Sequence, residues 1–161
     1  MDDMALLGRW RNWRTGLEYY DKEHDAVLFG ALDDCLINIK NHTYMPLDYK
    51  TRGFPPKDGA SEEYYQHQLD AYTLMLFENG YKVGDHAYLV YYYPKTVREN
   101  GAVDFEVKPV KIQADVERVR KMFQADVDLL NGDLPPAHSG GTNGSAGCEF
   151  GLWHKLAMEF D

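Results

Sequence analysis

Three short polar motifs, two on predicted strands and one on a predicted helix, constrain the fold of this chain most strongly. They comprise Asp33, then Asp48 and Lys50 two residues apart, then Gln68 and Tyr72 four residues apart. Because side chains alternate along a strand, Lys50 points to the same face as Asp48. Two carboxylates on neighbouring strands can hold a hard divalent cation, and a lysine beside them can position or polarise a water molecule. The pattern predicts a divalent metal site suited to phosphodiester hydrolysis.

The order of predicted elements is helix, hairpin, strand, helix, two strands and helix. Apolar periodicity and turn residues place helices at 4–13, 61–78 and 115–131, and strands at 16–20, 26–39, 44–51, 86–93 and 102–112. This order predicts an α/β fold with a mixed β-sheet of about five strands flanked by helices. We expect residues 1–132 to form one domain. Residues 133–161 should be a Gly/Pro-rich linker followed by a C-terminal segment that docks on the core.

Several boundaries depend on single residues. Ser61 is the expected N-cap of the second helix, and Asn79-Gly80 the expected end. Pro94 should end the strand 86–93. In the last strand, alternating apolar residues predict one buried face, and they are Val103, Phe105 and Val107.

Composition limits the function classes. The 161 residues carry a formal net charge of -9, which argues against a general nucleic-acid binder but does not exclude a nuclease. No apolar run of about 18 residues is present, and the N-terminus lacks the features of a signal peptide. Two cysteines, Cys35 and Cys148, make neither a disulfide framework nor a four-ligand zinc site. We therefore expect a cytoplasmic protein.

The two acids should come together in the hairpin that ends near residue 50. With a turn centred near Asn41, Asp33 falls almost opposite Tyr49, one position from Asp48. Carboxylates this close repel unless a cation or a shared proton intervenes. The alternative is a surface ladder of ion pairs, as on many exposed strands. Apolar flanking residues favour the buried site, because buried acids need partners.

Gly30 and the helix motif each allow two interpretations. A glycine inside a strand marks either a close approach of another group or a bulge that bends the strand. Gln68 and Tyr72 share one helix face, where Gln68 could orient Lys50 or a phosphate oxygen. For Tyr72 we favour a role in the core, and for Gln68 a role in the site. In the first helix, arginines and tryptophans could bind nucleic acid, but we favour a docking helix with Trp10 and Trp13 buried.

Taken together, the motifs Gly30-Ala-Leu-Asp33, Asp48-Tyr-Lys50-Thr-Arg-Gly53 and Gln68-Leu-Asp-Ala-Tyr72 resemble the PD-(D/E)XK nuclease superfamily. The nearest branch is the RecB-type and Cas4-like exonuclease domains. The resemblance covers residues 28–93 well and the last strand and helix loosely. It implies a restriction-endonuclease-like core that binds Mg²⁺ or Mn²⁺.

The resemblance also implies roles for individual residues. Asp33 and Asp48 match the metal-ligating acids, with the carbonyl of Tyr49 as a further ligand, and Lys50 matches the catalytic lysine. Gln68 matches the residue that supports catalysis. The residues expected to contact DNA are Gln68, Tyr72 and Arg52.

Two departures from the branch stand out. Relatives carry a Glu or His on a helix before the first strand, whereas residues 4–16 contain neither. The position is either vacant, lost with a missing N-terminal portion, or filled by Asp2 or Asp3. Many relatives also hold an iron–sulfur cluster with four cysteines, three of them near the C-terminus. Only Cys148 lies there, which argues against a cluster.

The leading function is therefore a metal-dependent, exonuclease-like DNase in DNA repair, recombination or CRISPR adaptation. Its partners would be single-stranded DNA or DNA ends, and a helicase or a CRISPR adaptation protein. The alternative is a catalytically degenerate nuclease-fold module that binds DNA or a helicase or protein partner without cutting. Retention of Asp33, Asp48 and Lys50 favours the enzyme, whereas the missing upstream acid and the net charge favour the alternative.

Overall fold

The computed structural model describes residues 4–133. Three helices and six strands follow one another in this part of the chain: α1 (Met4–Arg11), β1 (Leu17–Asp21), β2 (Ala26–Gly30), β3 (Asp34–Asn38), β4 (Thr43–Thr51), α2 (Ala60–Glu78), β5 (His86–Val97), β6 (Val103–Gln113) and α3 (Val116–Asn131). The expected α/β class is confirmed, and the elements follow the expected order except that the strand predicted at 26–39 is divided in two. The expectations for residues 134–161, including Cys148, lie outside the described residues.

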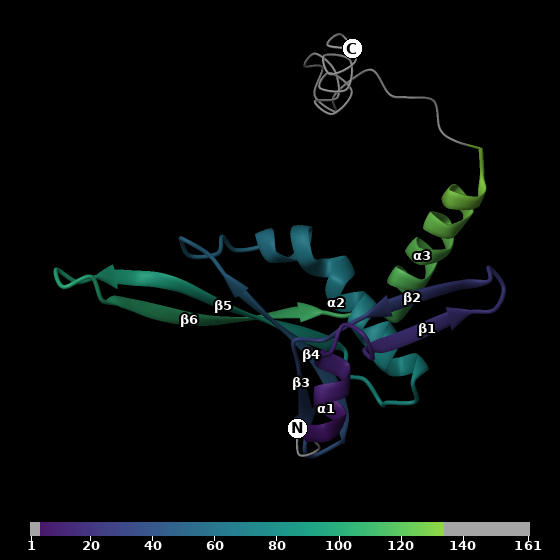
Figure 1. Ribbon diagram of the computed structural model, residues 1–161, viewed down its shortest axis with the longest axis horizontal. Helices are drawn as coiled ribbons and strands as arrows, with labels where there is room; N and C mark the ends of the chain where they lie inside the picture. Colours follow the sequence, from purple (N-terminus) through teal and green to yellow (C-terminus); the bar gives the residue numbers. More distant parts are fainter. Residues whose placement is uncertain (1–3, 134–161) are drawn as a thin grey trace, which may run out of the picture. The chain divides into compact units, whose positions relative to one another are not determined.

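The main sheet has four strands in the order β3-β4-β5-β6 (Figure 1). β4 and β5 are parallel and the other pairs antiparallel, so the sheet is mixed as expected. Parallel neighbours need a crossover connection, and α2 is that crossover. β1 and β2 form a separate antiparallel hairpin. β5 and β6 remain paired as far as Val97 and Val103, past the last β4–β5 pair at Thr51 and Tyr92.

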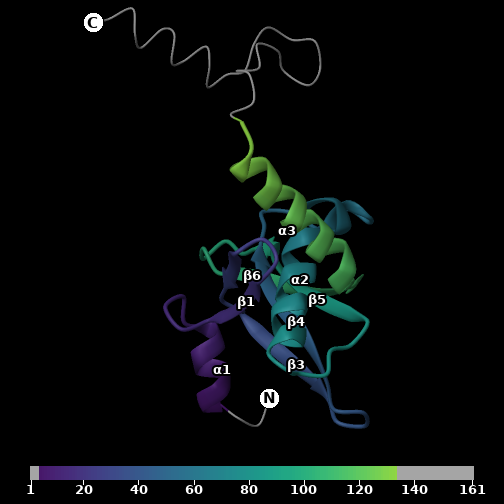
Figure 2. The ribbon, with the colours of Figure 1, turned by 90° about the vertical axis from the view of Figure 1, so that its right-hand side faces the viewer.

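Helix α2 lies along one face of the main sheet, next to β4 and β5 (Figure 2). Its Leu69 is fully buried in a cluster with Leu89, Tyr91 and Ile112 of β5 and β6. A second cluster joins the later turns of α2 to α1, β1 and α3, through residues such as Met75, Trp10 and Val119. Burial of these apolar side chains fixes the helix on the sheet.

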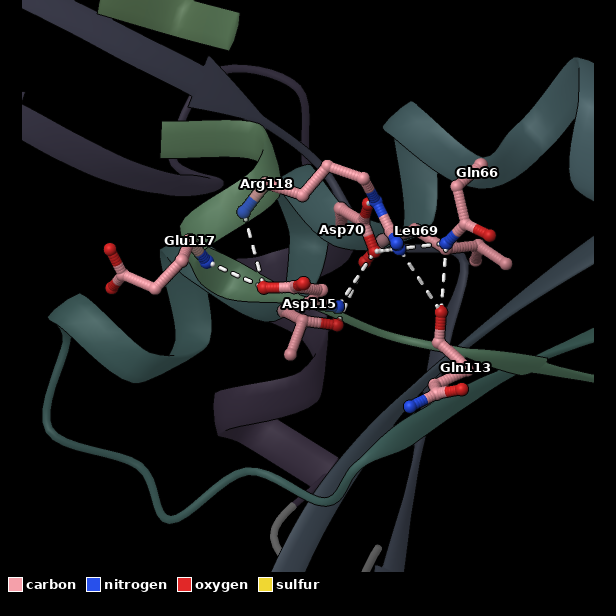
Figure 3. A network of polar contacts seen from close by, with 8 residues as sticks. Gln66, Leu69, Asp70, Gln113, Asp115, Glu117 and Arg118 are labelled. Carbon is pink, nitrogen blue, oxygen red and sulfur yellow. Dashed lines mark hydrogen bonds and ion pairs between the residues drawn. The ribbon is translucent and has the colours of Figure 1, made fainter. Parts of the chain in front are cut away.

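A polar network around one buried carboxylate holds the other side of α2 (Figure 3). Asp70 is fully buried and accepts hydrogen bonds from Arg118 Nε at 2.6 Å, Arg118 Nη2 at 3.0 Å and the backbone N–H of Asp115 at 2.9 Å. Gln66 Nε2 donates to Asp70 at 3.0 Å and to the carbonyl of Gln113 at 2.8 Å. A buried carboxylate requires such partners. The network therefore fixes α2 against the end of β6 and the start of α3.

The strand expected at 26–39 is two strands in two sheets, which corrects the sequence-based prediction. Between them, the N–H of Leu32 donates to the carbonyl of Trp10 at 3.0 Å instead of joining a sheet. Gly30 is the last residue of β2, and a Cβ there would lie 2.8 Å from Cε of Met75. The first interpretation of Gly30, a close approach of another group, is thus met by the Met75 side chain; Gly30 pairs in register with Leu17, so it forms no bulge.

Three local predictions were wrong. α2 begins one residue before Ser61, its N-cap is Gly59, and Ser61 Oγ instead lies 2.9 Å from the hydroxyl of Tyr91. β5 continues through Pro94 to Val97, with a register shift between Pro94 and Thr96 that accommodates the missing N–H. On β6, the expected buried residues are exposed, because they lie on the face opposite the one that bears Lys108 and Ile112 and faces α2; these are Val103, Phe105 and Val107.

The first helix only partly follows its prediction. Trp10 is buried and packs edge-on against Tyr81 with ring centroids 4.8 Å apart. Trp13 follows the end of α1 and is 71% exposed, with the guanidinium of Arg14 4.8 Å from its ring. Among residues 4–133, no helix has the length and apolar character needed to cross a membrane.

Candidate active site

The site lies between β4 and α2, at the end of β4 that leads into the loop before α2. Asp48 and Lys50 share one face of β4, as the alternation predicts. The face of α2 that covers them presents Gln68 and Tyr72, one helical turn apart. Asp33 joins them from the segment just before β3. The structure thus brings together all five residues of the three motifs.

Asp33 reaches the site by a register that differs by one residue from the expected one. Asn38 pairs with Thr43 and Asp34 with Leu47, so a continued ladder would place Asp33 opposite Asp48 rather than Tyr49. The turn between these strands includes His42, which has a positive φ of 55°. With this turn, Asn38 pairs with Thr43, and the register of the whole hairpin is shifted by one residue from the expected one. Asp33 Oδ2 accepts a hydrogen bond from the backbone N–H of Tyr49 at 3.0 Å. This bond holds one carboxylate beside the other.

Gln68 connects the site residues. Its Nε2 donates to Asp48 Oδ1 at 3.0 Å and to the Tyr72 hydroxyl at 2.9 Å, and its Oε1 accepts from Lys50 Nζ at 3.1 Å. The ammonium and the carboxylate determine the orientation of the amide, because the reverse orientation would set N–H groups against Nζ. Tyr72 also packs against both core clusters, so it serves the core, as favoured, and the site.

Asp48 is the most constrained group of the site. It is 2% exposed, and burial raises the pKa of its carboxyl, an effect that Lys50 partly offsets and the nearby Asp33 reinforces. Its Oδ2 forms an ion pair with Lys50 Nζ at 2.5 Å, and among the described residues this buried oxygen has no other donor. A buried carboxylate beside a second acid, with one lysine against the two negative charges, is a place for a further cation. The residues present therefore fit a divalent metal ion.

The other two candidate residues, Tyr49 and Arg52, lie beside the two acids and further along the chain, respectively. Tyr49 contributes its backbone beside Asp33, while its side chain points away and its hydroxyl donates to Asp34 Oδ2 at 3.1 Å. Arg52 lies further along, with its guanidinium 4.6 Å from the ring of Phe54 and 5.9 Å from that of Tyr91. Within residues 4–133, no group of three or more His, Cys, Asp or Glu residues could hold a metal ion. The upstream acid is thus not found in this part of the chain.

Two neighbours of the site were missed by sequence reasoning. The centre of the Tyr65 ring lies 4.5 Å from Lys50 Nζ, and this cation–π contact helps to hold the ammonium in place. Its position three residues before Gln68 places it on the same helix face, which is the signal that could have found it. Asp34 positions Tyr49 through the hydroxyl bond, which depends on the pairing of β3 with β4 and has no signal in the sequence.

A mixed sheet crossed by a helix, with acids and a lysine gathered beneath that helix, is a restriction-endonuclease-like fold. Over residues 4–152, the chain matches the family model of the PD-(D/E)XK nuclease superfamily, and it belongs to that superfamily. Members hydrolyse phosphodiester bonds, generally with divalent metal ions such as Mg²⁺, and DNA is the substrate that the superfamily implies. A comparison with curated proteins finds no match.

Proposed function

We propose that this chain is a Mg²⁺- or Mn²⁺-dependent deoxyribonuclease. The observation that carries the proposal is the convergence of Asp33, Asp48, Lys50 and Gln68, with Asp48 buried beside a second acid. Asp33, Asp48 and the carbonyl of Tyr49 would hold the metal ion. The bound ion would activate water and offset the negative charge that develops on the phosphate.

Lys50 would act on the scissile phosphate or on the attacking water. An ammonium has three donors, and the contacts with Asp48 and Gln68 occupy two directions. The third remains for a water molecule or a phosphate oxygen. Gln68 and the ring of Tyr65 fix Lys50 Nζ, so its positive charge is in position before the substrate binds. A charge positioned in advance stabilises the negative charge that develops in the transition state.

The residues around this centre support contact with a DNA strand. Tyr72 accepts a hydrogen bond from Gln68 and keeps its own O–H donor for a water molecule or phosphate. Arg52 stacks on Phe54, which is exposed, so a guanidinium and an aromatic ring lie together beyond Lys50. Arginine binds phosphate and an exposed ring can stack on a base. We therefore assign substrate contact to Gln68, Tyr72 and Arg52.

The motifs also suggest the type of nuclease and its pathway. Because the three motifs resemble those of the RecB-type and Cas4-like branch, we propose an exonuclease-like activity on single strands or ends. The pathway would be repair, recombination or CRISPR adaptation in the cytoplasm, with a helicase or adaptation protein as partner. The nuclease domain would span residues 1–132, with residues 133–161 as an appended linker and docking segment.

A second candidate is a degenerate module that binds DNA or a protein partner without cutting. The observation that favours it is the lack of a third acidic ligand within residues 4–133.

End-labelled single- and double-stranded DNA, incubated with Mg²⁺, Mn²⁺ or EDTA, separates the two candidates. Wild type should cut only with metal, Lys50→Ala should bind DNA without cutting, and Lys40→Ala, in the distant β3–β4 turn, should cut like wild type. Binding without cutting by wild type would select the module. Undiminished cutting by Lys50→Ala would refute the site.

A further inference from the structure

A cavity of about 300 Å³ opens beside the site, between the loop before α2 and the edge strand β6. Its lining includes three lysines and one aspartate, which leaves a net charge of +2 in a chain whose total is -9: Lys57, Lys108, Lys111 and Asp58. A concave positive site on an acidic molecule concentrates anions, because the surrounding protein focuses the local field. The first property of the cavity is therefore attraction for a negatively charged group.

The sheet register connects this cavity to the candidate active site. Lys50 pairs with Tyr91 on β5, and Tyr91 pairs with Lys108 on β6. Residues that are directly opposite share one face, so Lys50 and Lys108 lie on the same side of the sheet, two strand spacings or about 10 Å apart. Tyr91 between them is buried and its hydroxyl is bonded to Ser61, which makes the separation rigid.

The lysines of the cavity are available to a ligand. Lys108 Nζ contacts Asp58 Oδ1 at 3.2 Å, but the side chain of Asp58 is 98% exposed. Such a surface ion pair contributes little and yields to a stronger anion. Lys57 lies in the loop between β4 and α2 and lines the same cavity as Lys108.

We propose that this cavity is a second phosphate subsite, in which Lys57 and Lys108 bind the backbone of the DNA strand near the phosphodiester held at Asp48 and Lys50. This inference rests on the proposed function and deepens it. The subsite would set the direction in which the strand leaves the active site, along the row from β4 to β6. It would carry no base specificity, because phosphate contacts position a strand without reading its sequence.

The test measures the affinity of the full chain for a fluorescein-labelled single-stranded oligonucleotide in EDTA, over a series of salt concentrations. Each lost phosphate contact lowers the slope of log K against log salt by about 0.7. Lys57→Ala/Lys108→Ala should therefore lower the slope by about 1.4 and weaken binding at low salt. Lys22→Ala/Lys40→Ala removes the same charge from two exposed hairpin turns and should leave the slope unchanged.

A second variant tests whether Asp58 competes with the DNA backbone for Lys108. Asp58→Asn removes the carboxylate that contacts Lys108 and should tighten DNA binding, whereas damage to the fold would weaken it. Normal DNA binding with the same slope in Lys57→Ala/Lys108→Ala and in the control would overturn the subsite alone. Wild type that neither binds nor cuts DNA would overturn the proposed function and the subsite together.

Discussion

Gln68 on α2 donates a hydrogen bond of 3.0 Å to the buried carboxylate of Asp48 on β4. The same amide accepts from Lys50, so one helix residue sets the positions of both an acid and the lysine. Its own place depends on α2, which the core clusters hold on the sheet and the Asp70 network fixes from the other side. The geometry of the site is thus a consequence of how α2 packs.

Replacement of Gln68 should impair catalysis more than folding. We expect Gln68→Ala to lower the cleavage rate about 10- to 100-fold, as loss of a residue that orients metal ligands does. Because Gln68 acts through Asp48 and Lys50, the metal concentration at half-maximal rate should rise, which simple loss of folded protein would not produce. His67→Ala, at the exposed neighbouring position, is the control and should match wild type. Equal metal dependence in Gln68→Ala and His67→Ala would contradict this role.

Metal binding should stabilise the folded chain. A ligand that binds only the native state adds about 2.7 kcal/mol at 100 times its Kd. Thermal unfolding of wild type should therefore shift upward by several degrees with Mg²⁺ or Mn²⁺, and Asp48→Asn should lose the shift. Asp34→Asn, which alters a carboxylate bonded to Tyr49 outside the centre, should keep it. If Asp48→Asn kept the full metal-induced rise in unfolding temperature, the metal would have to bind elsewhere.

The Asp70–Arg118 pair should matter for stability. Arg118→Ala leaves Asp70 fully buried with fewer partners, and we expect a loss of about 2–3 kcal/mol, less than for a completely buried pair because Arg118 is partly exposed. Arg98 makes a similar two-pronged pair with Asp104 on the exposed ribbon, so Arg98→Ala should cost less than about 1 kcal/mol. Urea unfolding measures both variants, and equal losses would contradict the structural role of the network.

Acid should weaken the contact between β1 and α3. The hydrogen bond from Gln124 and those from the N–H groups of Glu23 and His24 outweigh burial and lower the pKa of Asp21 to about 2, from an ordinary 3.8. A lowered pKa in the folded state means that the charged form adds stability above about pH 4, and that this is lost as pH falls towards 2.

The pH dependence of unfolding checks this effect. The difference in stability between wild type and Asp21→Asn should be largest near neutral pH and shrink between pH 4 and 2. A constant difference over this range would show that Asp21 does not act through its charge.

Sequence reasoning identified the site because its residues obey local periodicities. Asp48 and Lys50 share a face by strand alternation, and Gln68 and Tyr72 by helix spacing. The family match confirms the superfamily, while the individual roles and the domain boundary at residue 132 stay predictions. The break of residues 26–39 into β2 and β3 was not predictable, because Leu32 finds its partner in α1 rather than in a neighbouring strand.

Other features depend on long-range packing that periodicity does not encode. The alternation of Val103, Phe105 and Val107 marks one face of β6 correctly, but that face is turned away from α2 and is exposed. Ser61 has the chemistry of an N-cap, yet its hydroxyl pairs with Tyr91 across the helix–sheet interface. The cavity lysines come together only because β6 pairs with β5 in this register.

The most direct test of the account is a single-turnover cleavage assay on end-labelled DNA, comparing wild type with Asp48→Asn in Mg²⁺, Mn²⁺ and EDTA. The substitution keeps the shape of the side chain and removes the charge, so the fold should persist and circular dichroism should verify it. We predict metal-dependent cutting by wild type and loss of cutting in Asp48→Asn. Metal-independent cutting, or cutting by Asp48→Asn at the wild-type rate, would contradict the assignment of the site to metal-dependent phosphodiester hydrolysis.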